Sequence, residues 1–206
     1  DDRQALAQEQ AEVDADLRVR FRLHTPWGSG PVTLSARGAH QAANAAQAAA
    51  VALVAGVEFD AVVAALAEVE VTGWRMRLER SAGGLVVLND SYNASPVAME
   101  AAIEALAGIP VAGRHIGVLG EMRELGEWSD EHHAAIGRAC ARAGLDLIIA
   151  VGAATAPLAE AARAGGVTVH EVTDAAAART LASELTRPGD AVLVKASRAL
   201  GLEIVV

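Results

Sequence analysis

The stretch from Leu85 to Pro96 reads LVVLNDSYNASP, and it decides the fold of the longer part of the chain. Its first four residues form a short, continuously apolar run, which predicts a strand that is buried on both faces of a sheet. The polar residues after it predict a turn. Ser95 and Pro96 then predict a helix start, with Ser95 as the N-cap and Pro96 at the first helical position.

The same order of strand, turn and helix continues to the end of the chain. Because the apolar runs are continuous rather than alternating, we expect a doubly wound, Rossmann-like α/β sheet with helices on both faces. Ligands of such sheets bind beyond the carboxyl ends of the strands, so the residues after each run form the candidate site. The further predicted strands are 116–119, 147–151, 167–169 and 191–194, and the predicted helices are 98–107, 130–143, 157–164 and 175–185.

The residues before Leu85 follow a different pattern. Apolar and polar residues alternate at 17–21 and 32–34 on either side of a turn-rich segment, which predicts a β-hairpin with a longer loop. An alanine-rich helix is expected over 39–57, ending at Gly56, and a second helix over 60–68. Because the pattern breaks at Thr72-Gly73, we expect one part at 1–72 and another at 73–206.

Composition excludes several classes of protein. The formal net charge of −9 argues against a general nucleic-acid binder, and no stretch approaches the roughly 18 apolar residues of a membrane span. The polar first residues predict no signal peptide. Cys140 is the single cysteine of the sequence, which excludes an intramolecular disulfide and fits a reducing, cytoplasmic location. We expect no metal site, because His132 and His133 project about 100° apart on a helix.

The turn after Leu88 allows two interpretations. Asp90 at a strand end suits the two hydroxyls of a ribose, and Tyr92 offers a stacking surface for a base. The same residues are equally typical of turn and helix-cap chemistry.

Two further strand ends carry polar residues. Residues 120–129 predict either the polar floor of a pocket or a solvated acidic loop, with Ser129 as the N-cap of the next helix. A histidine there is more often a satisfied surface or core residue than a ligand. Lys195, Ser197 and Arg198 suit a carboxylate or phosphate, the alternative being a cluster of surface salt bridges.

Two segments outside these strand ends add candidates. His40 and Asn44 lie four residues apart on one predicted helix face, where an exposed amide can contact a base edge or can simply be solvated. Arg75 or Arg77, near the junction of the two parts, could reach a phosphate.

Five segments in this order resemble those of one family, the ATP-dependent Mur ligases of peptidoglycan synthesis. They resemble most specifically the members that add D-alanyl-D-alanine, and the segment at 90–96 discriminates best among the sister ligases. The segments are HQAAN at 40–44, WRM at 74–76, DSYNASP at 90–96, GEMRELG at 120–126 with His133 and Gly137 beyond it, and VKASR at 194–198.

The resemblance implies a domain organisation. Residues 1–72 would be the C-terminal part of a central ATPase domain, and 73–206 the Rossmann-like C-terminal domain. The sequence contains no Gly-x-x-x-x-Gly-Lys-Ser/Thr phosphate loop, so we expect this chain to need the missing N-terminal half and to be inactive alone. Two alternatives stay open: a non-catalytic module that binds nucleotide or dipeptide, and a sister ligase such as a folylpolyglutamate synthase.

The resemblance also implies substrates and residue roles. ATP would activate the carboxylate of UDP-MurNAc-tripeptide for attack by D-Ala-D-Ala, with Mg²⁺ held mainly by the missing part of the central domain. Gln41, Ser95 and Ala196 depart from the residues usual in the family. The resemblance implies adenine contact for Asn44, His40 and Gln41, and γ-phosphate contact for Arg75. Asp90 would contact the ribose, with Tyr92 and Asn93 beside the nucleotide. A dipeptide pocket would be lined by Glu121, Met122, Glu124, Leu125, Lys195, Ser197 and Arg198.

Overall fold

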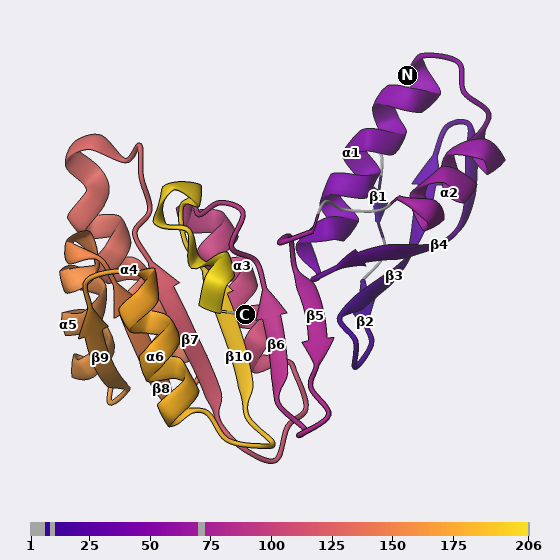
Figure 1. Ribbon diagram of the computed structural model, residues 1–206. Helices are drawn as coiled ribbons and strands as arrows, with labels where there is room; N and C mark the ends of the chain where they lie inside the picture. The colour runs from indigo at the N-terminus through magenta and orange to yellow at the C-terminus, as the bar shows by residue number, and fades with distance from the viewer. Residues whose placement is uncertain (1–6, 9–10, 70–72, 206) are drawn as a thin grey trace. The chain divides into compact units, whose positions relative to one another are not determined.

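The computed structural model describes residues 7–8, 11–69 and 73–205, and the chain divides into two compact units, Asp1–Thr72 and Gly73–Val206 (Figure 1). Within the described part of the chain, each helix is too short or too polar to cross a bilayer.

The first unit is an antiparallel sheet covered by two helices. Strand β3 (Arg18–Thr25) pairs with β4 (Gly28–Arg37), and the short strands β1 (Ala7–Gln8) and β2 (Glu12–Val13) pair with successive parts of β3. Buried and exposed residues alternate along β3 and β4, as the pattern predicts. Helices α1 (His40–Val54) and α2 (Phe59–Glu68) contribute the rest of the core.

The predicted longer hairpin loop is wrong. Thr25 pairs with Gly28, so only Pro26 and Trp27 connect the strands. The Thr25 hydroxyl oxygen accepts the N–H groups of Trp27 and Gly28, each at 3.1 Å, and this closes the turn early. Glycine is required at position 28, because a Cβ there would lie 2.6 Å from the ring of Phe59.

The second unit is built on a six-stranded sheet in the order β5-β6-β10-β7-β8-β9. All neighbours are parallel except β5, which pairs antiparallel with β6 at one edge. The five predicted strands are confirmed. The bounds are β5 (Arg77–Arg80), β6 (Val86–Asn89), β7 (His115–Gly120), β8 (Leu147–Val151), β9 (Thr168–Val172) and β10 (Ala191–Lys195).

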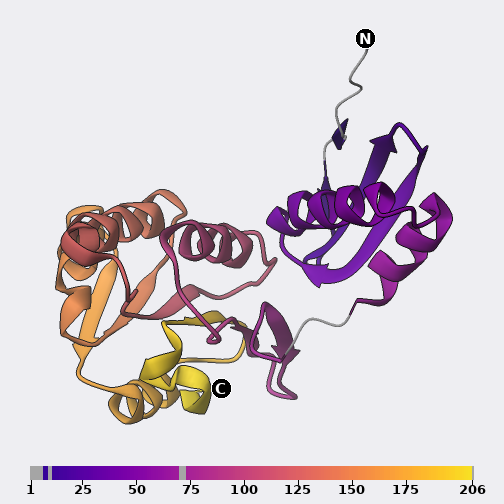
Figure 2. The same cartoon turned by 90° about the horizontal axis from the view of Figure 1, so that it is seen from above.

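Helices cover both faces of this sheet, which confirms the doubly wound prediction. Figure 2 shows α3 (Pro96–Ala107), α4 (Ser129–Arg142) and α5 (Ala156–Ala164) on one face. The other face carries α6 (Ala175–Leu185) and the short 3-10 helix η4 (Leu202–Val205). There Ala178, Ala182 and Leu202 pack against the sheet residues Ile116, Val118, Ile149, Val192 and Val194.

The edge strand β5 was not predicted. Its sequence, RLER, contains no apolar run, and its side chains are exposed or only half-buried. Charged residues on an edge strand discourage pairing with another chain, but they also erase the pattern by which buried strands are recognised.

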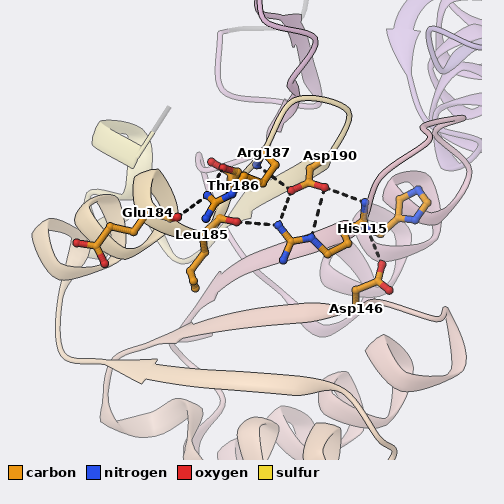
Figure 3. A network of polar contacts seen from close by, with 8 residues as sticks. His115, Asp146, Glu184, Leu185, Thr186, Arg187 and Asp190 are labelled. Carbon is orange, nitrogen blue, oxygen red and sulfur yellow. Dashed lines mark hydrogen bonds and ion pairs between the residues drawn. The ribbon is translucent and has the colours of Figure 1, made fainter.

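A polar network closes the amino-terminal ends of β7 and β10 (Figure 3). The carboxylate of Asp190 accepts hydrogen bonds from Arg114 N (2.9 Å), Nε (3.4 Å) and Nη2 (2.7 Å) and from Arg187 N (2.9 Å). Beside it, Asp146 accepts the N–H of His115 at 2.8 Å. Burial opposes ionisation of Asp190, but Arg114 and the two backbone N–H groups hold its pKa below the ordinary 3.8.

Candidate active site

The strand order places the carboxyl ends of β6, β10 and β7 side by side, although their sequences are far apart. A buried ion pair joins the first two of these ends. The ammonium of Lys195 lies 2.5 Å from Asp90 Oδ2 and 2.8 Å from the carbonyl oxygen of Asn93. Lys195 is only 2% exposed. The lysine predicted for the dipeptide pocket therefore contacts the residues predicted for the nucleotide.

The segment Trp74–Met76 lies against the turn that follows β6. Met76 N–H donates to Asp90 Oδ1 at 3.0 Å, and Tyr92 N–H donates to the carbonyl oxygen of Trp74 at 3.2 Å. Trp74 and Met76 have φ values of 75° and 49°, in the left-handed region that costs free energy for residues other than glycine. The two hydrogen bonds and the burial of Met76 hold this conformation.

Two arginines at this edge stack on aromatic rings. The guanidinium carbon of Arg75 lies 4.1 Å from the centre of the Tyr92 ring, and that of Arg198 lies 4.2 Å from the Trp74 ring. Arg198 also pairs with Glu203 at 3.2 Å. Both stacks are open to solvent, and Arg198 is 48% exposed, so both cations are accessible to an anionic ligand.

The other predicted phosphate ligand, Arg77, lies elsewhere. It is exposed at the start of β5, where it pairs with Glu79 at 3.0 Å. Of the two arginines considered, only Arg75 stacks on the turn after β6.

The loop after β7 is tied to the loop after β10 by two hydrogen bonds. Ser197 N–H donates to the carbonyl oxygen of Glu121 at 3.0 Å, and Ser197 Oγ accepts Arg123 N–H at 2.9 Å. The approach requires glycine at position 120, because a Cβ there would lie 2.7 Å from the side chain of Ala196. The structure thus brings together the two segments that the resemblance assigns to one pocket.

The predicted pocket residues of this loop differ in their placement. Glu121 accepts Ala154 N–H at 3.3 Å through Oε1, so its carboxylate faces the turn after β8. The side chain of Met122 is buried, Leu125 is half-buried, and Glu124 is exposed with a φ of 65°. Only some of these side chains are therefore open to a ligand.

The predicted N-cap at Ser129 is wrong, whereas that at Ser95 is confirmed. A 3-10 turn, η1 (Gly126–Trp128), leads directly into α4, so Ser129 is already helical and makes no capping bond. Ser95 has an extended backbone, and its side chain accepts Ala98 N–H, with Pro96 in the first turn.

Helix α4 also carries a buried histidine and a buried cysteine. His133 is fully buried, and both ring nitrogens have partners, as expected for a satisfied core residue. Burial raises the pKa of the Cys140 thiol to about 12, so this cysteine is an inert core residue rather than a nucleophile.

The candidates of the first unit lie at the start of α1. Asn44 is exposed and donates from Nδ2 to Gln41 Oε1 at 3.1 Å, because residues three apart are neighbours on a helix surface. His40 is half-buried at the first position of the helix. Within the described residues, the oxygen of this exposed amide has no hydrogen-bond partner, so it can accept from a ligand.

A family model for "Mur ligase, glutamate ligase domain" matches residues 74–198. The chain belongs to the Mur ligase family. Over 92% of its length it is 39% identical to the UDP-N-acetylmuramoyl-tripeptide–D-alanyl-D-alanine ligase of Mycobacterium leprae, of which it covers 41%. It therefore spans less than half the length of this curated relative.

Solved Mur ligase structures share the fold. MurF from Acinetobacter baumannii is 30% identical with a TM-score of 0.83, and the alignment covers 97% of this chain and 43% of that one. MurF ligase from Thermotoga maritima, solved in complex with ADP, is 26% identical with a TM-score of 0.75, covering 97% and 44%.

Sequence reasoning missed two features of this edge. Trp74 lies in the WRM segment at 74–76, for which no stacking role was predicted. An aromatic residue next to a candidate arginine is nevertheless a signal for stacking. The contact between His133 and Met122 has no local signal, because it is a hydrogen bond from a backbone N–H of the loop to a ring nitrogen 11 residues further along the chain.

Proposed function

We propose that this chain is the C-terminal half of a ligase that joins D-Ala-D-Ala to UDP-MurNAc-tripeptide at the expense of ATP. The observation that carries the proposal is the meeting of the 90–96, 120–126 and 194–198 segments at one sheet edge in a Mur ligase fold. The name of the Mycobacterium leprae relative supplies the two substrates.

The proposed reaction has two steps. The tripeptide carboxylate attacks the γ-phosphorus of ATP, which gives an acyl phosphate and ADP. The dipeptide amine then attacks the acyl carbon, an amide bond forms, and inorganic phosphate leaves with the former carboxylate oxygen. Charge spreads over phosphoryl oxygens in such transfers, so fixed cations supply most of the stabilisation.

Asp90 fits the role of a ribose ligand. An ionised carboxylate offers about four lone-pair sites. Among the described residues, Met76 N–H and the Lys195 ammonium occupy two of them, so two remain for a pair of hydroxyls. We propose that Lys195 orients Asp90, and that Tyr92 and Asn93 lie beside the nucleotide.

Arg75 suits a mobile phosphate ligand. Its guanidinium is stacked on Tyr92, and no acid among the described residues pairs with it, so none of their carboxylates must be displaced when it moves to an anion. We propose that it binds the γ-phosphate. His40 and Asn44 are proposed as adenine ligands, with the free Asn44 oxygen accepting from an exocyclic amine.

We propose that Ser197, Arg198 and the 121–126 loop form the dipeptide pocket, in which Arg198 binds the terminal carboxylate. Arg198→Ala should then raise the KM for D-Ala-D-Ala without loss of fold, because this side chain lies largely outside the core.

Mg²⁺, when bound, would neutralise charge on the phosphates. Among the described residues, His, Cys, Asp and Glu side chains nowhere gather in a group of three or more that could hold a metal ion. From the resemblance to the Mur ligases, we propose that the metal and a phosphate loop, which this sequence does not contain, belong to the rest of the enzyme. This chain alone should not ligate.

The test is a ligation assay in which this chain is combined with the rest of its enzyme, in a buffer that resembles the cytoplasm. We expect release of phosphate that depends on ATP, UDP-MurNAc-tripeptide and D-Ala-D-Ala together. Inactivity of a properly assembled pair would overturn the proposal. Tight binding of ADP or D-Ala-D-Ala by the chain alone, measured by calorimetry, with no turnover after assembly would instead indicate a binding module.

A further inference from the structure

The ring of His133 is held in one protonation form by its neighbours. Its Nδ1 lies 2.8 Å from the carbonyl oxygen of Ser129, which can only accept, so Nδ1 carries the proton. The Ser129 hydroxyl lies 3.3 Å from the same nitrogen. On the opposite side, Nε2 lies 3.0 Å from Met122 N–H, which can only donate. The ring is therefore neutral, with a lone pair directed at the loop after β7.

This lone pair accepts the one hydrogen bond that the Met122 N–H makes within the described part of the chain. Met122 is 2% exposed, so its N–H is shielded from water. A buried N–H without an acceptor is costly, and this cost would favour a different path of the loop. His133 thus sets the position of the loop at its second residue.

The two flanking residues of the loop are fixed from the other side. Glu121 O and Arg123 N both bind Ser197, at 3.0 and 2.9 Å. Three consecutive residues are therefore held alternately by α4 and by the segment after β10. Beyond these three residues the chain turns through left-handed conformations at Glu124 and Gly126. A displacement of Met122 should therefore also displace the exposed part of the loop.

We propose that His133 is a positioning residue for the second substrate: through Met122 it sets the loop that, with Ser197 and Arg198, receives the dipeptide. The inference rests on the proposed function for the identity of that substrate. This role differs from that of a core residue. It predicts that loss of the imidazole changes the KM for D-Ala-D-Ala but not the KM for ATP.

The test compares three variants in the assembled enzyme. His133→Leu removes both ring nitrogens at similar volume and should raise the KM for D-Ala-D-Ala about 10- to 100-fold, the scale expected for a misplacement of about 1 Å, with the KM for ATP unchanged. His133→Gln places an acceptor oxygen near the position of Nε2 and should recover most of this loss. Cys140→Ala, at another fully buried position of α4, should lower thermal stability without changing either KM.

Wild-type KM values in a folded His133→Leu enzyme would overturn the inference. The inference would also be overturned if His133→Leu raised the KM values for D-Ala-D-Ala and ATP equally, or if Cys140→Ala raised the KM for D-Ala-D-Ala as much as His133→Leu does. Either result would make His133 a structural residue. Hydrogen exchange of the unmutated protein tests the contact without any variant: the Met122 amide should be protected, and rapid exchange would contradict the inference. If the unmutated enzyme did not ligate, the proposed function would fail, while the exchange result would still report on the hydrogen bond.

Discussion

Two buried carboxylates at opposite ends of the same sheet differ in how many of their hydrogen-bond acceptor sites are occupied. Asp190, before β10, accepts four hydrogen bonds, from Arg114 and Arg187, and this matches the roughly four acceptor sites of a carboxylate. Asp90, after β6, accepts two from the described residues, through Met76 and Lys195. Both ends hold an acid and a base in contact, but of these two carboxylates Asp90 alone has acceptor sites that the described residues leave open.

The comparison shows that a cluster of polar residues does not by itself mark a binding site. At the amino-terminal edge, the polar groups satisfy one another and close the sheet (Figure 3). At the carboxyl-terminal edge, Asp90 retains acceptor sites and two arginines rest on aromatic rings. Spare hydrogen-bonding capacity, rather than polarity, distinguishes the edge that we propose binds the substrates.

A large effect on stability alone is expected from Asp190→Ala. It leaves Arg114 and the N–H of Arg187 without their acceptor, so the free energy of unfolding should fall by about 3 kcal/mol, toward the lower end for a broken buried pair because Arg114 is partly exposed. Chemical unfolding of the chain measures this loss. In the assembled enzyme, at a temperature where the variant is folded, both KM values should stay unchanged; an altered KM would mean that the two edges are coupled.

Asp90→Ala should lower both stability and ATP affinity. It strands the buried Lys195 ammonium, so stability should fall by about 3–5 kcal/mol, and the KM for ATP should rise as well. Adding Lys195→Met removes the stranded charge and should restore most of the stability but not the ATP affinity. Chemical unfolding and ATP titration of both variants check this, and recovery of ATP affinity in the double variant would make Asp90 a structural residue.

Arg75→Ala tests the cation that rests on Tyr92. Loss of one fixed positive group at a developing phosphoryl charge typically lowers a rate about 10²- to 10³-fold, and we expect a loss of that size in the ligation rate of the assembled enzyme. Arg77→Ala is the matched control, because that guanidinium is exposed and paired with Glu79. Equal rates for the two variants would remove Arg75 from the phosphate site.

A smaller effect is expected in the pH dependence of stability, which tests the Asp190 network at the amino-terminal ends of the strands. Because the folded pKa of Asp190 is below its ordinary 3.8, its contribution is complete well above that value and is lost as the pH falls through 3.8 toward the folded pKa. Wild-type stability should fall more steeply there than that of Asp190→Asn, by at most about 1.4 kcal/mol per pH unit. Asp14 and Asp174, whose pKa values are also lowered, titrate in both proteins and cancel in the difference. Parallel curves from thermal melting would contradict the saturated network.

Local sequence rules predicted the elements that are buried on both faces. The continuous apolar runs located five of the six strands in the second unit, and Ser95-Pro96 located the start of α3. The rules failed where a single side chain or a neighbouring turn decides the outcome. Thr25 closed the hairpin early, and the 3-10 turn before Ser129 removed the extended residue that a cap requires.

The partners of the site residues could not be predicted from spacing. Lys195, Ser197 and Arg198 are near neighbours in sequence, which suggested one anion site, but they contact Asp90, Arg123 and the Trp74 ring respectively. Lys195 and Asp90 lie 105 residues apart, and they meet only because β10 is inserted between β6 and β7. The pairing of Lys195 with Asp90 therefore depends on the sheet order, which no local sequence pattern encodes.

The smallest expected effect concerns Trp74. Arg198 has two partners, the Trp74 ring at 4.2 Å and Glu203 at 3.2 Å, and an exposed cation–π contact contributes about 0.5–1 kcal/mol. Trp74→Ala should therefore raise the KM for D-Ala-D-Ala about two- to fivefold by freeing Arg198, and Trp74→Phe should restore most of it. Thermal stability should hardly change, because Trp74 is exposed. Steady-state kinetics at low and high salt separate the two partners, since salt screens the pairing with Glu203 more than the stack. An unchanged KM in Trp74→Ala would show that Glu203 alone positions Arg198, and the stacked arginine would then cease to distinguish the two edges.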